Sequence, residues 1–134
     1  VEQLGGPKIP GIGFAMGMER LVLLLQQAGS APGPAVTDLF IAALGEEAGR
    51  KAFQLTHQLR MRGKKVAIDL DGRSLKSQMK QAAKCQARYT LILGEDELAK
   101  SEAQLRNMAD GQQQAIALPG TIQDWCNGIV QAIT

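Results

Sequence analysis

The sequence predicts an α/β domain with a mixed five-stranded sheet and three helices, preceded by a strand–helix segment. Two observations support this fold class. Short apolar runs alternate with helical patterns between residues 38 and 93, the order of elements found in a parallel sheet with right-handed crossovers. Two further runs, 102–108 and 113–118, flank a turn signal, which predicts an antiparallel hairpin.

The composition is typical of a globular chain with an aliphatic core. Of the 134 residues, 45% are hydrophobic and 21% are charged, so we expect a buried core and no extensive disorder. Only 4% are aromatic, which leaves the core to aliphatic side chains. Cys85 and Cys126 stand far apart in a chain without a secretory leader, so we expect reduced thiols in a cytoplasmic protein.

Residues 11–25, GIGFAMGMERLVLLL, predict a short strand at 12–15 and then a helix. From Met18 the apolar residues recur with helical spacing, and further leucines widen this face until it almost surrounds the helix. Residues 1–36 cannot cover such a helix alone, so we expect it to dock on the rest of the chain or on a second chain. A Glu-Arg pair interrupts the run and excludes a membrane span.

A boundary follows this helix. The stretch GSAPGPAV at 29–36 is rich in proline and glycine, which is typical of a linker. We therefore expect an N-terminal segment at 1–30, a linker at 31–36 and a second domain at 37–134.

The strands and turns of the second domain are predicted from short apolar runs. Three short runs predict strands: DLFIAAL (38–44), KVAIDL (65–70) and YTLIL (89–93). The first is a continuous apolar run, as in a buried parallel strand. Ala109-Asp110-Gly111 separates the last two strands and predicts the hairpin turn.

The helices are predicted from apolar stripes and from their end signals. The first, 46–62, begins with two glutamates that suit the helix dipole, and Gly63 ends it. Ser74 can cap a second helix that runs from residue 75 to about residue 86, and Thr121 can cap the last one.

Residues 60–90 carry nine basic side chains against two aspartates, which indicates an anionic partner. Lys76, Lys80 and Lys84 recur every four residues on one helix face, and other basic residues are close in sequence. Two interpretations stay open: a stripe that contacts phosphates, or a solvated face with Leu75 and Met79 packed inward. The basic residues close in sequence to this lysine stripe are Arg60, Arg62, Lys64 and Lys65. With a single histidine, His57, we expect no metal site.

The glycines at 11, 13 and 17 do not form a known nucleotide fingerprint, because their spacing is one residue too long for the dinucleotide motif and no G-K-[ST] follows. They can form a structural turn. A glycine-rich strand also lets a flat ring approach the backbone. Arg20 lies at the start of a helix, where a cation is disfavoured unless an anionic ligand is bound.

The run GIGFAMGMERL, with GGPKIP before it, resembles the third signature motif of class II aminoacyl-tRNA synthetases, in the form found in the histidyl-tRNA synthetase family. Five later blocks resemble the C-terminal anticodon-binding domain of that family, in order and spacing. They are TDLFIAALGEE, LRMRGKKVAIDLD, RSLKSQMKQAAK, ARYTLILGEDEL and QLRNMADGQQQ. The resemblance implies the end of a catalytic domain at 1–30, followed by an anticodon-binding domain.

The resemblance also implies a function. The parent histidine–tRNA ligase would activate histidine with ATP and Mg²⁺ and charge tRNA(His), as a cytoplasmic homodimer with no membrane partner. The matching positions place Gly13 and Gly17 beside adenine and give Arg20 a catalytic contact with the ATP phosphates. The other two class II motifs are absent, so we expect this fragment to bind no cofactor and to be inactive alone.

The anticodon stem-loop of tRNA(His) is the implied partner of the second domain. Polar residues on the exposed side of the sheet and in adjacent loops would read the bases, and the lysine stripe would contact the phosphates. The candidate nucleic-acid contacts are Glu46, Arg73, Lys76, Lys80, Gln104, Arg106 and Asn107.

Two alternatives were weighed against this interpretation. One is a non-catalytic tRNA-binding or regulatory module derived from the synthetase, although such regulatory paralogues usually lack the second domain. The other is a flavodoxin-like or receiver domain. It is disfavoured because the first strand ends in Ala43-Leu44-Gly45 without a phosphate-binding Ser/Thr loop, and no strand ends in a phospho-acceptor aspartate with its partners.

Overall fold

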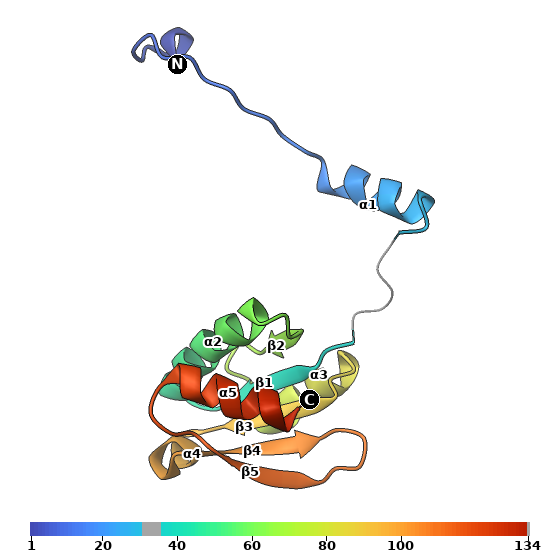
Figure 1. The fold of residues 1–134 in the computed structure, drawn as a ribbon, viewed down its shortest axis with the longest axis vertical. Coiled ribbons are helices and arrows are strands. Elements are labelled where there is room, and N and C mark those ends of the chain that lie inside the picture. Colours follow the sequence, from blue (N-terminus) through green and yellow to red (C-terminus); the bar gives the residue numbers. More distant parts are fainter. Residues whose placement is uncertain (31–35, 134) are drawn as a thin grey trace. The chain divides into compact units, whose positions relative to one another are not determined.

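The computed structural model describes residues 1–30 and 36–133, which belong to two compact units, Val1–Pro34 (unit 1) and Ala35–Thr134 (unit 2). Unit 1 contains a short 3₁₀ helix, η1 (Glu2–Leu4), and the helix α1 (Met18–Gln27). Unit 2 contains the sheet and the other helices (Figure 1). The linker expected at 31–36 lies outside the described residues, except for Val36.

The sheet of unit 2 is mixed and five-stranded, as predicted, with the order β2-β1-β3-β4-β5. The first three strands of the chain are parallel to one another, and the hairpin formed by β4 and β5 is antiparallel. The strands are β1 (Leu39–Ala43), β2 (Val66–Ile68), β3 (Tyr89–Leu93), β4 (Glu102–Asn107) and β5 (Gln113–Ala117).

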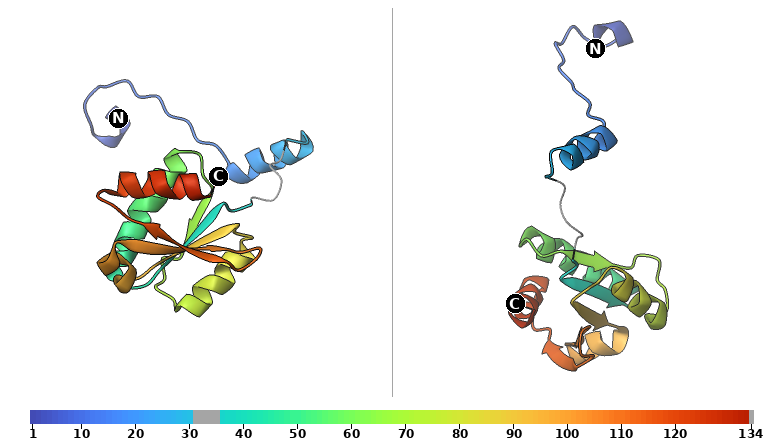
Figure 2. Two further views of the ribbon diagram at one scale, coloured as in Figure 1. Left: turned by 60° about the horizontal axis from the view of Figure 1, so that its bottom comes forward. Right: turned by 90° about the vertical axis from the view of Figure 1, so that its right-hand side faces the viewer.

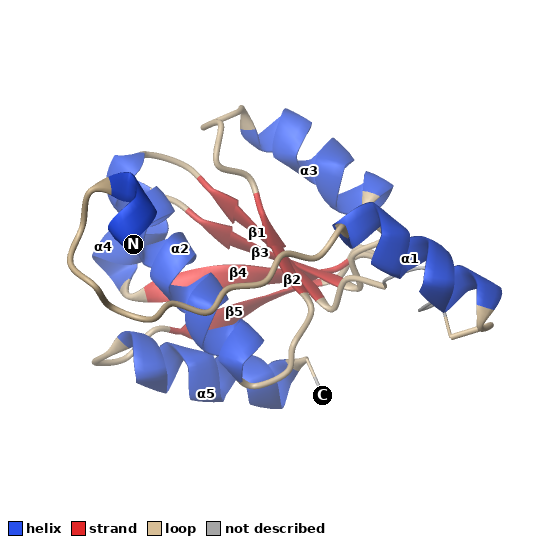
Figure 3. Cartoon of the chain, turned by 90° about the horizontal axis from the view of Figure 1, so that it is seen from above, coloured by secondary structure: helices blue, strands red, loops and turns tan. Residues whose placement is uncertain are grey.

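The helices cover the two faces of the sheet unequally. α3 packs on one face, and α2 and α5 pack on the other (Figures 2 and 3). A short helix, α4, adds a fourth to the three expected in this unit; its three acidic residues suit the positive end of the helix dipole. The backbone N–H of Gly94 donates to Glu97 Oε2 at 3.0 Å and closes its first turn. The helices are α2 (Glu46–Met61), α3 (Leu75–Lys84), α4 (Glu95–Lys100) and α5 (Ile122–Ala132).

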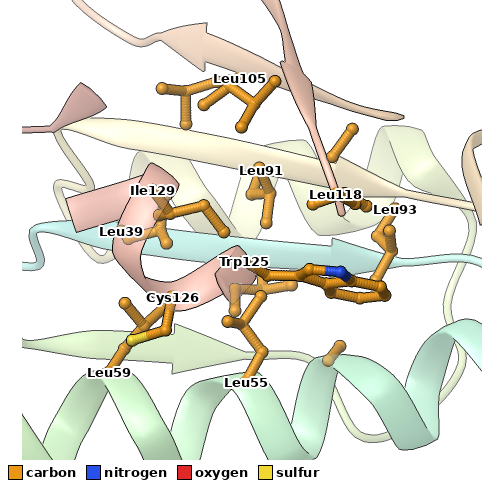
Figure 4. Packing of buried hydrophobic residues seen from close by; sticks show 14 of the residues in the cluster. Leu39, Leu55, Leu59, Leu91, Leu93, Leu105, Leu118, Trp125, Cys126 and Ile129 are labelled. Atoms are coloured by element: carbon orange, nitrogen blue, oxygen red, sulfur yellow. The ribbon is translucent and has the colours of Figure 1, made fainter. Parts of the chain in front are cut away.

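Strand β1 is buried on both faces and separates two apolar cores. Leu39 and Ile41 point into the larger core with α2 and α5, where Trp125 packs (Figure 4). Phe40 and Ala42 point into the smaller core with Ala82 of α3. The period-2 alternation of side chains along a strand produces this division, and it explains why the run is apolar without interruption.

The predicted helix ends are mostly confirmed. Gly63, with φ of 77°, follows the last turn of α2. Thr121 caps α5: its Oγ1 accepts the Asp124 N–H at 3.4 Å, and its own N–H donates to Asp124 Oδ2 at 2.9 Å. Ser74 occupies the position before α3, but its side chain makes no capping hydrogen bond.

In unit 1 the helix is observed and the strand is not. α1 begins at Met18, as predicted, but residues 11–17 have no regular secondary structure. A strand needs a paired neighbour, and the described part of unit 1 contains none. The aliphatic residues Leu21–Leu25 are 39–56% exposed, so residues 1–30 leave the helix uncovered; its docking remains a prediction. Among the described residues, no helix is both long and apolar enough to cross a membrane.

Candidate nucleic-acid interface

The carboxyl ends of the parallel strands β1 and β2 meet at one edge of the sheet, where open α/β sheets usually bind ligands. Glu46 follows β1 and Arg73 follows β2, so the fold brings these two predicted residues to the same edge. A surface hollow lies between the two strand ends. It is lined by Ala43, Gly45, Glu46, Gly49, Asp69, Leu70 and Gly72.

Gly45 is required at this edge by its backbone. Its φ is 96°, which favours glycine, and a Cβ there would lie 2.7 Å from Glu95 Oε1. The exposed Glu46 begins α2 and accepts a hydrogen bond from Arg50 at 3.1 Å. Since both side chains are exposed, this pair is weak, and Glu46 remains accessible to a ligand.

Arg73 is held by two aspartates of its own loop. The buried Asp69 accepts the Arg73 backbone N–H at 3.0 Å, and its Oδ1 lies 3.7 Å from the guanidinium. Asp71 accepts a hydrogen bond from the same guanidinium. The Arg73 side chain is 44% exposed, so it faces the surface in an ion-paired state. Asp69 is not among the predicted contacts, although DLDGR after an apolar strand is a signal for a loop organised by aspartates.

Lys76 and Lys80 are both exposed on α3. Together with Ser74 and Ser77 they line one hollow on the helix surface, which places two ammonium groups and two hydroxyls around it. Such donors are the ones that contact nucleic-acid phosphates. The opposite side of α3 packs on the sheet through Leu75, as expected, and through Ala82, whereas the half-buried Met79 is not part of this core.

Gln78 is fully buried on that inward side of α3, which the sequence analysis missed. The available signal was positional: Gln78 lies three residues after Leu75 and four before Ala82, on the same helix face as both.

Four other basic residues of the run 60–90 do not line the hollow on α3. Arg60 donates two hydrogen bonds to the carbonyl of Val66, at 2.8 and 3.1 Å, and Arg62 donates to Asn127 Oδ1 at 2.6 Å. Lys64 and Lys65 precede β2, and neither lines the hollow on α3. Two members of the basic run in the sequence, Arg60 and Arg62, are thus engaged in hydrogen bonds within the domain.

Gln104 and Arg106 of β4 lie on the sheet face that α3 shares. Phe40, which packs against α3, is in register with Thr90 and, through it, with Arg106. Ala42 is likewise in register with Ile92 and Gln104. Residues paired across strands point to the same face, and both β4 side chains are half-exposed there. This face continues into Gln113 and Ala115 of the exposed edge strand β5.

Asn107 is separated from these two residues. It is the neighbour of Arg106, so strand alternation turns it to the other face. Its side chain belongs to the hairpin turn: Oδ1 accepts the Ala109 N–H at 2.9 Å and Nδ2 donates to Asp110 Oδ2 at 3.3 Å. Asn107 therefore shapes the turn that joins β4 to β5.

Gly13, Gly17 and Arg20 are exposed in unit 1. A Cβ added to Gly13 would meet nothing within 4 Å, and one added to Gly17 would meet only Arg20 Cβ at 3.7 Å. The backbone of both glycines is therefore accessible, as is the Arg20 side chain. Their contacts with ATP remain a prediction.

Two aromatic side chains of unit 2 belong to its packing. Trp125 is part of the larger core, and Tyr89 packs against that core with its ring 6.0 Å from the Arg88 guanidinium. His57 is exposed on α2. Burial raises the pKa of the Cys126 thiol. In residues 1–30 and 36–133, no three His, Cys, Asp or Glu side chains gather as a metal site would require.

The fold and this surface define a class of small α/β domain. Such a domain has a mixed sheet, polar side chains on part of one sheet face and a basic helix on the same face. A family model described as an anticodon binding domain matches residues 38–123. Because this match extends over more than half of the chain, the chain belongs to the anticodon-binding domain family.

Comparison with individual proteins identifies the similar enzymes more narrowly. The chain is 52% identical over 124 residues to the histidine–tRNA ligase of Syntrophotalea carbinolica, which is 92% of the chain and 29% of that protein. The apo histidyl-tRNA synthetase structure of S. aureus matches with a TM-score of 0.62 and 34% identity, over 81% of the chain and 28% of that chain. The predicted resemblance to the histidyl-tRNA synthetase family is thereby confirmed, although the chain spans less than a third of the length of these relatives.

A more distant structure shares the fold alone. The RNA binding domain of threonyl-tRNA synthetase from Cryptosporidium parvum Iowa II matches with a TM-score of 0.56 and 19% identity, over 69% of the chain and 23% of that chain.

Proposed function

We propose that this chain is the C-terminal part of a histidine–tRNA ligase and that unit 2 recognises the anticodon of tRNA(His). The observation that carries the proposal is the sheet face on which Gln104 and Arg106 stand in register with the strand residues beneath the basic helix α3. This face presents an amide and a guanidinium group that can read base edges, and the helix that packs on it, α3, carries two lysines on its outward side that can bind phosphates. The family match and the histidine–tRNA ligase relatives support it.

The two kinds of contact perform different tasks. Lys76 and Lys80 bind backbone phosphates and supply affinity that weakens with salt. Unstacked anticodon bases are read through their edges by the Gln104 amide and the planar fork of Arg106. At the strand ends, Glu46 can accept hydrogen bonds from base amino groups, and Arg73 can donate to base carbonyls or phosphates.

The whole protein, in this proposal, activates histidine with ATP and Mg²⁺ and charges tRNA(His) as a homodimer in the cytoplasm, where translation occurs. Arg20 would bind the ATP phosphates, and the backbone at Gly13 and Gly17 would lie against adenine. Bound ATP supplies the leaving group that makes activation of the carboxylate favourable. These residues form only part of such a site, so the isolated chain is expected to be inactive.

A direct assay tests the expected inactivity. Histidine-dependent exchange of pyrophosphate into ATP is measured with the 134-residue chain and with a full-length histidine–tRNA ligase as the positive control. We expect exchange from the full-length enzyme alone. Robust exchange by the chain would contradict the assignment of unit 1 as an incomplete part of the catalytic domain.

A binding experiment tests anticodon recognition. The chain is titrated with the anticodon stem-loop of tRNA(His) and with a stem-loop of the same length whose anticodon bases are replaced. We expect tighter binding of the first RNA at every salt concentration, because base contacts add to the shared phosphate contacts. Equal binding of the two RNAs would contradict anticodon reading, and no binding of either would contradict the RNA interface.

A further inference from the structure

Gln78 is a polar side chain with no exposed surface, and it lies between the two lysines proposed to bind RNA phosphates. An amide buried without hydrogen bonds destabilises a fold, so the partners of this side chain identify what it holds.

The Gln78 amide makes three hydrogen bonds to backbone groups of two different segments. Its Oε1 accepts the Ala43 N–H at 3.1 Å, and its Nε2 donates to the Ala43 carbonyl at 2.8 Å. The same Nε2 donates to the Arg73 carbonyl at 2.7 Å. One side chain of α3 therefore joins the last residue of β1 to the loop that follows β2.

The bonds to Ala43 replace a missing strand partner. β1 pairs with β2 only from Leu39 to Ile41, whereas it pairs with β3 as far as Ala43. The next residue, Leu44, donates its N–H to Leu93 on the β3 side. Backbone groups alternate in direction along a strand, so those of Ala43 point to the side where β2 has ended. The Gln78 amide completes the ladder there.

This side chain connects the elements that carry the proposed RNA contacts. Ala43 lies three residues before Glu46, and Arg73 is bonded directly through its carbonyl. Lys76 and Lys80 lie two residues before and after Gln78, about 200° around the helix, so they face outward while Gln78 faces inward.

We infer that Gln78 is a positioning residue for RNA recognition: its amide holds the end of β1, the β2–α3 loop and α3 in one arrangement, and thereby sets the distances among the RNA-contacting side chains. The inference rests on the proposed function of unit 2. It assigns Gln78 an effect on base discrimination, because reading base edges depends on geometry more strongly than phosphate attraction does.

The test substitutes Gln78→Met, which keeps the length of the side chain and removes all three hydrogen bonds. Gln81→Met is the matched control, because Gln81 is a half-buried glutamine on the same helix whose Oε1 has no hydrogen-bond partner. Each variant is titrated with the tRNA(His) anticodon stem-loop and with the anticodon-replaced stem-loop over a range of salt concentrations. Folding of each variant is verified by circular dichroism.

We expect Gln78→Met to lower the preference for the tRNA(His) stem-loop by about tenfold, the effect of losing roughly one net hydrogen bond in the complex. The slope of log K against log salt should stay unchanged, because both lysines remain. Gln81→Met should keep the wild-type preference. If Gln78 had a merely structural role, the substitution would weaken the binding of both RNAs equally. An unchanged preference for the tRNA(His) stem-loop in folded Gln78→Met therefore overturns the inference.

Amide hydrogen exchange supplies a readout that does not depend on RNA. In Gln78→Met the Ala43 amide should exchange faster, while the Leu91 amide in the centre of the sheet should not change. An unchanged Ala43 rate overturns the positioning role even if the RNA data agree with it. If the wild type shows no preference between the stem-loops, the proposed function fails, and the Ala43 rate still reports separately on whether Gln78 holds the strand end.

The wild-type chain provides a measurement that remains decisive if Gln78→Met does not fold. The side-chain amide resonances of Gln78 are followed by NMR during titration with the tRNA(His) stem-loop. We expect them to shift although the group is inaccessible, because the elements that it joins adjust to RNA. The side-chain amide resonances of Asn127, on the helix α5 that packs on the other face of the sheet, should not shift. Unshifted Gln78 resonances on RNA binding overturn the inference.

Discussion

At the scale of single residues, the state of Arg73 shows how local carboxylates govern a candidate RNA contact. Its guanidinium is bonded to the exposed Asp71 and lies 3.7 Å from the buried Asp69. Asp69 also accepts the Arg73 backbone N–H, so it holds the loop, whereas Asp71 bonds only the guanidinium. We therefore expect the two aspartates to have separable effects on RNA binding.

We predict that Asp71→Asn strengthens binding of the anticodon stem-loop about two- to tenfold, because it releases the Arg73 guanidinium and removes a negative charge beside the RNA. Glu19→Gln in unit 1 removes the same charge elsewhere and should leave the affinity within about twofold. Fluorescence anisotropy at a fixed salt concentration measures both. Equal effects of the two substitutions would indicate a net-charge effect with no role for the Asp71–Arg73 pair.

Asp124 gives the start of α5 a defined pH dependence. The hydrogen bonds from Thr121, side chain first and backbone second, hold the pKa of Asp124 below its usual value. A carboxyl whose pKa is depressed by folding stabilises the protein above its unfolded pKa, and this contribution is lost as pH falls through the folded pKa.

We therefore predict that Asp124→Asn lowers the free energy of unfolding at pH 7, and that the difference from the wild type shrinks as pH falls below about 4. Urea unfolding at several pH values measures this difference. Gln123→Ala, at the neighbouring exposed position, should show a pH-independent difference. A constant difference for Asp124→Asn between pH 7 and pH 2.5 would contradict the capping role of the carboxylate.

At the scale of elements, α3 combines two faces with different tasks. Its outward face carries Lys76 and Lys80 around a hollow with two serines, and its inward face carries the apolar contacts and Gln78. Lys64 and Lys65, which precede β2, do not line this hollow. These two lysine pairs allow a charge-matched comparison.

We predict that Lys76→Ala with Lys80→Ala weakens both stem-loops and flattens the dependence of log K on log salt by about 0.7 for each lost phosphate contact. The double variant Lys64→Ala with Lys65→Ala removes the same charge and should leave the slope close to that of the wild type. Isothermal titration at four salt concentrations gives both slopes. Equal flattening in the two variants would contradict a localised phosphate-binding face.

At the scale of the whole molecule, the chain consists of a unit with two cores and a unit whose described part has no buried side chain. Every residue of both cores lies between Leu39 and Ile133. The exposed residues Leu21–Leu25 give unit 1 an apolar surface that is available for docking.

We predict that a variant consisting of residues 36–134 unfolds cooperatively, with a Tm within a few degrees of that of the whole chain, because it retains every core contact. Its affinity for the anticodon stem-loop should also be unchanged. Thermal unfolding followed by circular dichroism measures the Tm. A large fall in Tm on removing residues 1–35 would contradict this independence and would show that α1 is covered by unit 2.

Most element types were predictable because they depend on local pattern. The apolar run at 39–44 is typical of a strand buried on both faces, and the capping signal at Thr121 is complete within four residues. The strand expected at 12–15 failed because pairing needs a partner outside the segment. α4 was not among the three predicted helices, because six residues are too few to show a helical period.

The sequence by itself determined the fold class, the family and the presence of a basic helix, since periodicity, turn residues and motif order are local properties of the chain. Only the tertiary structure decided which polar residues share a surface. It placed Arg106 and Gln104 on the α3 face, turned Asn107 into the hairpin, used Arg60 and Arg62 as structural donors, and buried Gln78 against Ala43. Strand register and helix packing join residues that are distant in sequence, so no local pattern records them.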